Sequence, residues 1–283
     1  MSTTLRLGES GITLGEIDSL GCRWGATGDE PWSPSPAPRA NTGDLANDHG
    51  SWDATEFYGP RSYALDGYII APTHQALHQA KGRLFAACPI GAFELRVSEP
   101  GFERFGTFRR NGEAVWAELS PISPPTARFS VPLIAVDPRI YGTNSKTATT
   151  NYPSTSGGLE WSATWPVTWD ATVTSGQMVL TNEGDSPAPV LWRIDGPVTD
   201  PMVVDLATGD RMRVNLDIPA GDWITIDTAT HRVLYRGEQG ATRRSKWSGR
   251  WLGVNPGSHQ FGLSATTGDP AAELTATYRD TWI

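Results

Sequence analysis

Two short apolar runs, separated by a segment that no helix can cross, constrain the fold of this chain more than any other feature. They lie in 179–204, which reads VLTNEGDSPAPVLWRIDGPVTDPMVV. Residues 182–185 favour a turn, and Pro187 and Pro189 cannot donate the backbone hydrogen bonds that a helix or a strand ladder requires. The pattern predicts two β-strands on either side of an irregular connection, and much of the remaining sequence repeats it.

Length and composition favour two β-rich domains. The chain has 283 residues, enough for two domains of ordinary size that each bury a core. Its 30 glycines and 22 prolines interrupt short apolar runs, which is typical of strands joined by turns. The formal net charge of −8 excludes a general role in binding nucleic acid or anionic lipid, because an acidic protein repels polyanions.

The cysteines and the N-terminal segment indicate the cellular compartment. Cys22 and Cys88 are too few for a disulfide framework and have no zinc-site spacing, so we interpret them as small buried apolar residues. The N-terminal segment lacks the pattern of a signal peptide, and no run approaches the roughly 18 apolar residues that cross a membrane. We therefore expect synthesis and folding in the cytoplasm, without membrane insertion.

Alternating apolar residues predict the strands of the first domain. Residues 5–24 read as an opening hairpin, and 63–69 and 129–133 read as strands with one apolar face. Between 25 and 43, four prolines and the lack of periodicity predict an extended loop. We interpret this loop as an arm that packs on its own domain or on a neighbouring subunit; a proline-rich ligand for another protein is the alternative.

One helix is predicted over 73–87, where Thr73 can cap the first turn and apolar residues recur at helical spacing. His74 and His78 lie four residues apart and could share a face as metal ligands. However, no glutamate of an HExxH motif lies between them, and no third ligand is evident nearby. The isolated His49 beside a glycine is typical of a turn. We predict no metal site and no cofactor.

The strongest short-range hairpin signal is the Asn-Gly pair within Arg110-Asn111-Gly112-Glu113, because Asn-Gly favours the positive φ angles of a two-residue turn. Arg109 and Arg110 would give this hairpin a charged tip. Exposed hairpins and strand edges often pair across subunits of an assembly. Our candidate inter-subunit contacts are therefore Arg109, Arg110, Asn111 and Gly112.

A polar segment rich in Ser, Thr and Asn predicts the domain boundary. It covers 143–158 and has no apolar periodicity, so we expect a linker there. The linker would separate a first domain at 1–142 from a second β domain at 159–283. Limited proteolysis is expected to cut within it.

Three tryptophans begin the second domain. Trp161, Trp165 and Trp169 are spaced by four, which places all three on one face of a strand. Coplanar indoles could stack on sugar rings, but tryptophan also commonly fills a sandwich core or a subunit contact. We favour the second interpretation and keep sugar stacking as the alternative.

A local basic cluster lies near the end of the chain. Arg243, Arg244, Lys246 and Arg250 surround Trp247 and together resemble a small nucleic-acid-binding patch. Four cations in an acidic protein more commonly form a solvated turn or a salt contact between subunits.

Several motifs, in their order along the chain, resemble those of phage distal tail proteins. No single motif is specific, but together they span nearly the whole sequence. In the first half they are Asp48-His49-Gly50, Tyr58-Gly59, Arg61, the Leu65-x-Gly67-x-Ile69 strand and Asp137-Pro138…Tyr141. In the second half they are the 182–185 turn, Gly196-Pro197, the 221–227 strand and Trp251-Leu252…Pro256-Gly257.

The resemblance implies a mainly β fold. It implies an N-terminal β-sandwich with one helix and an extended hairpin, followed by a C-terminal galectin-like or jelly-roll β-sandwich. Two departures matter: the proline-rich insertion at 31–38 does not belong to the family pattern, and the second domain has no assignable galectin sugar-binding signature.

The implied function is that of a structural virion protein at the tip of a long non-contractile tail. Such proteins form a hexameric ring that joins the tail tube to the host-recognition apparatus. The implied partners are other copies of this chain, the tail tube protein and the tape-measure or receptor-binding tail proteins, with a host cell-wall saccharide as a further candidate. We expect residues 1–141 alone to form the ring.

No catalytic motif is evident. The sequence has no nucleophile elbow, no phosphate-binding Gly-rich loop, no calcium loop and no dinucleotide fingerprint. We therefore predict that the protein is not an enzyme. The rival hypothesis is a carbohydrate-binding module or sugar-active enzyme that uses the face formed by Trp161, Trp165 and Trp169.

Overall fold

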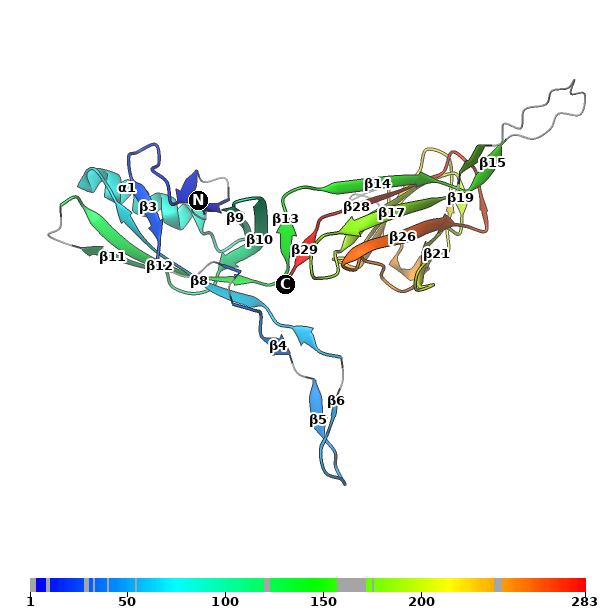
Figure 1. Cartoon of the computed structure of the whole chain (residues 1–283), viewed down its shortest axis with the longest axis horizontal. Helices are drawn as coiled ribbons and strands as arrows, with labels where there is room; N and C mark the ends of the chain where they lie inside the picture. The colour runs from blue at the N-terminus through cyan, green and yellow to red at the C-terminus, as the bar shows by residue number, and fades with distance from the viewer. Residues whose placement is uncertain are drawn as a thin grey trace, which may run out of the picture. The chain divides into compact units, whose positions relative to one another are not determined.

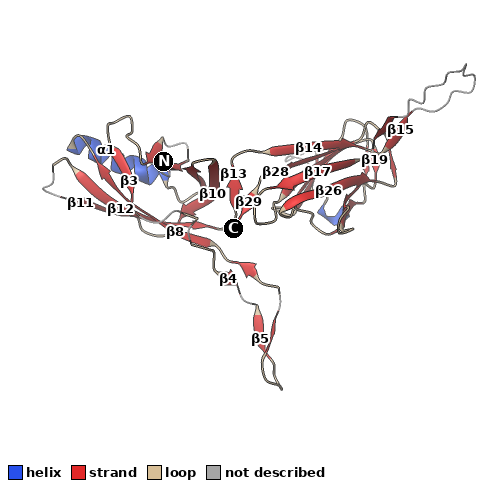
Figure 2. Ribbon diagram, in the orientation of Figure 1, coloured by secondary structure: helices blue, strands red, loops and turns tan. Residues whose placement is uncertain are grey.

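The chain divides into two compact units, Met1–Thr143 together with Ile283, and Asn144–Trp282. The computed structural model describes residues 4–8, 11–27, 31–32, 34–39, 41–53, 55–119, 123–156, 172–174, 176–236 and 241–283. Within these residues almost all regular structure is β, with one α-helix and one short 3-10 helix (Figure 2). None of the described helices is long and apolar enough to span a membrane. The predicted mainly β fold class is therefore confirmed.

The first unit is built on antiparallel strands in the order β2-β1-β9-β10-β12-β8-β3 (Figure 1). Strand β10 joins two parts of this arrangement, because most of it pairs with β9 and only its last two residues pair with β12. Its elements are β1 (Thr4–Leu7), β2 (Ile12–Leu14), β3 (Arg23–Ala26), β4 (Pro38–Arg39), β5 (Thr42–Asp44), β6 (Ser51–Asp53), β7 (Phe57–Tyr58), β8 (Arg61–Ile70), α1 (His74–Ala87), β9 (Phe93–Glu99), β10 (Phe102–Arg110), β11 (Val115–Leu119), β12 (Thr126–Ala135) and β13 (Ile140–Gly142).

The helix and the opening hairpin of the first unit match the sequence-based predictions. The hydroxyl of Thr73 accepts a hydrogen bond from the backbone N–H of Ala76 at 3.1 Å, so the predicted cap is confirmed. The helix buries its apolar stripe in the core, with Leu77 and Leu84 both almost fully covered. The register pairs Leu5 with Leu14, which places both apolar side chains on one face.

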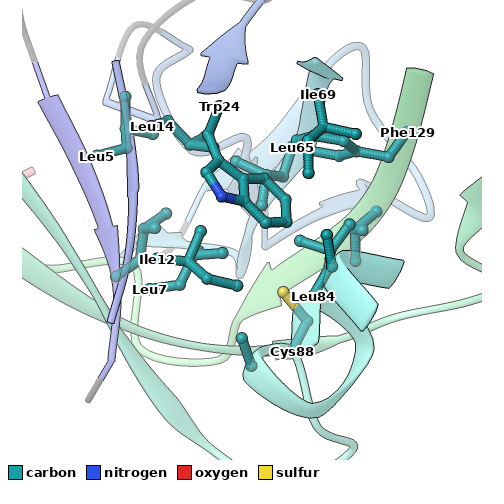
Figure 3. Packing of buried hydrophobic residues seen from close by; sticks show 14 of the residues in the cluster. Leu5, Leu7, Ile12, Leu14, Trp24, Leu65, Ile69, Leu84, Cys88 and Phe129 are labelled. Atoms are coloured by element: carbon teal, nitrogen blue, oxygen red, sulfur yellow. The ribbon is translucent and has the colours of Figure 1, made fainter. Parts of the chain in front are cut away.

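Trp24 lies at the centre of the first core (Figure 3). It is 1% exposed, packs edge to face on Phe129, and donates a hydrogen bond from Nε1 to Asp18 at 3.0 Å. Burial alone would raise the pKa of Asp18, but the bonds from Trp24 and from the backbone N–H groups of Cys22 and Leu20, together with Arg83, outweigh it and lower the pKa. Asp18 thus ties the loop before β3 to helix α1.

The second unit is a sandwich of two five-stranded antiparallel sheets, β14-β28-β18-β23-β24 and β17-β26-β20-β21-β25. Trp192 fills its centre, 5.2 Å from Phe261, and donates from Nε1 to the backbone oxygen of Leu252. Its elements are β14 (Lys146–Asn151), β15 (Ser154–Ser156), β16 (Thr172–Thr174), β17 (Gln177–Asn182), β18 (Val190–Asp195), β19 (Val198–Thr199), β20 (Met202–Asp205), β21 (Arg211–Val214), β22 (Asp217–Ile218), β23 (Trp223–Asp227), β24 (Arg232–Tyr235), η1 (Arg244–Lys246), β25 (Trp247–Gly249), β26 (Gly257–Ser264), β27 (Thr267–Gly268), β28 (Glu273–Tyr278) and β29 (Thr281–Trp282).

The turn between β17 and β18 carries the chain from one sheet of this sandwich to the other. Asn182, 1% exposed, organises the crossing. Its amide donates to the backbone oxygens of Ser186 and Val254, and its Oδ1 accepts from the N–H groups of Gly184 and Thr281. The two apolar strands predicted around this turn are present, and each belongs to a different sheet.

Within the segment expected to form a linker, 143–158, the structure describes strand β14, which belongs to the second unit. Strand β14 pairs with β28 along its whole length, from Lys146 opposite Tyr278 to Asn151 opposite Glu273. The composition of this segment looks polar because the side chains that face inward are small. Ala148 is half-buried and Thr150 is buried, while Thr149 between them is exposed. This alternation is that of a strand with one covered face.

Candidate assembly surfaces

The described residues of the first unit within 34–39, 41–53 and 55–60 form a two-stranded arm. Pro38–Arg39 pairs with Phe57–Tyr58, and Thr42–Asp44 pairs with Ser51–Asp53, so β4 to β7 form a ribbon that continues from β8 (Figure 1). The extended loop predicted for 25–43 is thus corrected: part of it is one side of a hairpin. Its prolines do not prevent this pairing. Each strand of a two-stranded ribbon has an outer edge without a partner, where the backbone N–H that proline lacks is not needed.

Large apolar side chains of the arm are exposed. Trp52 is 48% exposed, Phe57 61% and Tyr58 48%. The indole of Trp52 covers Gly43, its cross-strand partner, which orders one aromatic ring at the outer half of the ribbon. A two-stranded hairpin is marginally stable by itself, and we expect its exposed aromatic side chains to be covered by another molecule.

The root of the arm is fixed by a buried arginine. Arg61 is 2% exposed and donates to the backbone oxygens of Trp32, Pro34 and Pro138. No acidic side chain accompanies it among the described residues, and burial lowers the pKa of its guanidinium. The N–H of Gly59 donates to the oxygen of Ala37 at 2.7 Å. Both sides of the arm are therefore held where they leave the core.

The motif residues at the arm tip form a turn. Asp48, His49 and Gly50 lie between β5 and β6, where Gly50 has a φ of 103°. The carboxylate of Asp48 accepts a hydrogen bond from the N–H of His49. The turn predicted for His49 is thus confirmed.

The segment with the candidate contacts Arg109, Arg110, Asn111 and Gly112 is not the hairpin turn that the sequence suggested. Strands β10 and β11 both pair with β12, one after the other along the same edge, and not with each other. The break lies opposite Pro132, whose oxygen accepts from the N–H of Asn111 and which has no N–H to return. Gly112, with a φ of 130°, passes close over the proline ring. Arg109, Asn111 and Gly112 are exposed there.

The histidines and cysteines of the first unit that the sequence analysis considered form no metal site or reactive group among the described residues. His74 and His78 are exposed on α1, and no group of three metal-binding side chains occurs among the described residues. Cys22 and Cys88 are free and buried, as predicted. Burial raises the pKa of the Cys88 thiol to about 12, and nearby Arg110 opposes this only in part. Cys88 is therefore not a reactive thiol at neutral pH.

Trp161, Trp165 and Trp169 of the second unit lie outside the described residues. Of the basic cluster, Arg244 and Lys246 lie in η1 and Arg243 precedes it. Arg250 follows β25 and forms an ion pair with Asp210 at 2.8 Å. Trp247 and Trp251 stack at 4.1 Å between ring centres, and His231 stacks on Trp251 at 4.5 Å. Sequence reasoning missed this stack, because the four-residue spacing of Trp247 and Trp251 does not indicate stacking and His231 comes from an earlier turn of the chain.

A hollow of about 330 Å³ lies against β20, β21 and β25. Arg211, Arg213 and Ser248 line it, and Arg213 is paired with Asp200 at 2.8 Å. It contains no catalytic arrangement of side chains.

Comparison with known proteins gives three findings. Residues 183–282 match the model of a family described as siphovirus-type tail component, C-terminal domain. The crystal structure of the SPP1 Dit (gp 19.1) protein, described as a paradigm of the hub adsorption apparatus in phages that infect Gram-positive bacteria, covers 100% of both chains with a TM-score of 0.60 and 12% identity. The baseplate of phage P2 in its activated conformation with Ca covers 98% of both chains, with a TM-score of 0.47 and 10% identity. A search of curated proteins gives no match.

Proposed function

We propose that this chain, whose resemblance to phage distal tail proteins is confirmed by the family match of its second unit and by the fold shared with SPP1 Dit, forms a ring of six copies at the tail tip. The ring would join the tail tube to the host-recognition apparatus of a long non-contractile tail. The matched family is a structural tail component, so the proposed role is structural and not enzymatic.

The observation that carries this proposal is the arm of the first unit. Its exposed aromatic side chains need a partner surface, and its root is held by Arg61 at the core. A closed ring requires a patch on each copy to meet a different patch on the next. An ordered projection with apolar side chains is suited to such a heterologous contact.

The segment from Arg109 to Gly112 is a second candidate contact of the ring. Because β10 ends there and β11 begins only at Val115, backbone groups of Asn111 and Gly112 lie at an irregular sheet edge. Irregular edges with charged side chains resist indiscriminate pairing and suit a specific partner. We assign Arg109, Arg110, Asn111 and Gly112 to inter-subunit contacts as part of the proposal.

The second unit would lie outside the ring wall. Its two sheets enclose their own core around Trp192, and the apolar side chains that its strands expose are few and scattered. The other proposed neighbours are the tail tube protein and the tape-measure or receptor-binding tail proteins. The assembled protein would lie in the virion tail after synthesis in the host cytoplasm.

The mass of the purified full chain in solution tests the proposal. We expect light scattering to give six times the 30.6 kDa of one chain, and negative-stain images to show closed rings. A chain that remains monomeric over the whole accessible concentration range contradicts self-assembly. A stable dimer with no larger species contradicts the ring.

A further inference from the structure

The hollow against β20, β21 and β25 has the size of a site for a small molecule. Its volume is about 330 Å³, at the lower end of the range of about 300–1,000 Å³ that ligand sites occupy. It lies on the solvent-facing side of the sheet that also contains β26 (Figure 1). This follows from β21, where Arg211 and Arg213 are exposed while Met212 and Val214, which alternate with them, are buried. The hollow is therefore accessible without any rearrangement of the core.

Cross-strand pairing places several of the lining side chains in one row. Arg213 pairs with Met202 on β20 and with Ser248 on β25, and directly opposed residues lie on the same face of a sheet. Gly249, with a φ of 107°, permits the close approach of β25 to β21, because a Cβ there would overlap the backbone oxygen of Arg211. Ser248 thus lies beside Arg213 in a fixed register.

The guanidinium of Arg213 is held in place at the hollow. It pairs with Asp200 at 2.8 Å, and the backbone N–H of Asp200 donates to the oxygen of Leu216 at 3.0 Å. Asp200 has a φ of 52°, in the left-handed region that residues other than glycine seldom occupy. Backbone conformations of this kind concentrate at ligand-binding sites. The position of Arg213 is therefore prearranged.

Arg211 is the unpaired cation of the hollow. Within the described part of the chain, its guanidinium has no hydrogen bond and no carboxylate within ion-pair distance. The neighbouring Asp210 does not neutralise it, because Asp210 pairs with Arg250 at 2.8 Å. Two arginines and one aspartate are the charged lining groups, so the hollow is locally cationic in a protein with a formal net charge of −8. A free guanidinium binds an oxyanion through two N–H donors, so the hollow favours an anionic ligand.

The rest of the lining matches the other parts of a sugar ring. Ser248 and Thr266 each present a hydroxyl, which donates and accepts hydrogen bonds as sugar hydroxyls do. Neither hydroxyl has a partner among the residues that the structure describes. Met202 and Ala265 supply an apolar wall, and a methionine side chain adapts to irregular shapes. Because sugar rings combine hydroxyls with C–H faces, they fit this lining.

We propose that the hollow binds a saccharide unit with one oxyanionic substituent, a carboxylate or a phosphate. Arg211 would bind the oxyanion, the hydroxyls of Ser248 and Thr266 would bind ring hydroxyls, and Met202 would lie against a C–H face. The inference goes beyond the proposed ring and does not depend on it, because every residue of the hollow belongs to the second unit.

Calorimetric titration of the full-length protein with four probes tests the proposal. The probes are glucuronic acid, glucose 6-phosphate, glucose and inorganic phosphate, each at low ionic strength. We expect at least one of the two anionic sugars to bind tenfold or more tightly than both glucose and inorganic phosphate. The tighter of the two identifies the substituent. Added salt should weaken its binding, because salt screens the charge of exposed arginines.

Variants locate the binding at the hollow. Arg211→Ala should weaken binding of the tighter sugar by tenfold or more, and Arg211→Lys, which keeps the charge without the bidentate geometry, should lie between Arg211→Ala and wild type. The matched control is Arg232→Ala, which removes another exposed arginine, on β24 of the other sheet, and should leave the affinity unchanged. Ser248→Phe places a ring in the hollow and keeps both arginines. It should abolish sugar binding with an unchanged melting temperature, because position 248 is exposed.

Four outcomes would overturn the proposal. Neither anionic sugar binds more tightly than glucose, or inorganic phosphate binds as tightly as both of them, which indicates an adventitious ion only. Arg211→Ala leaves the affinity unchanged, or Arg232→Ala lowers it as much as Arg211→Ala does, which indicates attraction by surface charge in general. The mass of the chain in solution, which tests the ring, enters none of these measurements, so the two proposals fail separately.

Discussion

The indole of Trp52 lies on the backbone of Gly43, directly across the ribbon of the arm. A Cβ at position 43 would overlap the six-membered part of that indole and its Nε1. The pair therefore requires glycine on one strand and an aromatic ring on the other, and it orders the outer half of a segment that has little else to hold it.

Replacing Gly43 should loosen the arm without unfolding the unit that carries it. In Gly43→Val the indole must leave its place, so we expect protease cleavage within 41–53 to become several-fold faster. The melting temperature should change little, because the core around Trp24 is untouched. Gly91→Ala is the matched control, since a Cβ there meets no atom within 4 Å. Equal cleavage rates in wild type and Gly43→Val would contradict the assigned role.

Removing the buried arginine at the arm root should destabilise the first unit. Arg61→Ala leaves the oxygens of Trp32, Pro34 and Pro138 without their donor, and a buried polar group left unsatisfied costs about 1–3 kcal/mol. We expect a loss of at least that size in urea unfolding. Arg39→Ala, at an exposed position on the arm, should stay within about 0.5 kcal/mol of wild type.

Asp18 should make the first unit sensitive to acid. Its folded-state pKa is lowered, so its contribution is fully present above the unfolded-state pKa of about 3.9 and is lost as the pH falls through the folded-state value. Asp18→Asn should lower stability at pH 7 by roughly 1–3 kcal/mol and flatten the stability profile below about pH 4. Unfolding curves at several pH values check this; a variant with an unchanged acid limb would contradict it.

Strand β14 should be required by the second unit. A fragment of residues 144–283 keeps the pairing of β14 with β28, whereas 159–283, the boundary expected from composition, lacks it. We expect the shorter fragment to melt roughly 8 °C lower or more, which corresponds to about 2 kcal/mol for a domain of this size. Circular dichroism of the two fragments measures the difference. Equal melting temperatures would show that 143–158 acts as a linker after all.

Local signals in the sequence predicted the elements whose formation depends on neighbouring residues. Thr73 and the apolar spacing after it define α1, and alternation defines β8 from Tyr63 to Ile69. The apolar runs around Asn182 were likewise found, because turn residues and prolines bound them. In each case the deciding information lies within about ten residues.

The sequence contains no local signal for which strand pairs with which other strand. Gly112 has the positive φ that an Asn-Gly pair favours, but Asn111 does not. The outcome depended on Pro132, which interrupts the edge that both neighbouring strands share. The segment 143–158 appeared polar, yet β14 finds its partner in β28, far along the chain. The pairings of the arm were hidden for the same reason. The composition of a segment indicates whether it tends to be exposed to solvent. It does not indicate which sheet edge the segment will pair with.

The crossing at Asn182 has a consequence for how the protein is made. The side chain of Asn182 binds the N–H of Thr281, and the backbone of Gly184 leaves no space for a Cβ beside Thr281, which is itself fully buried. The turn after β17 thus cannot complete its contacts until residues about a hundred positions later are present. This unit remains an incomplete sandwich for as long as Thr281 is unavailable to it, so chaperone binding to the newly made chain should persist until that residue is free to pair and should end then.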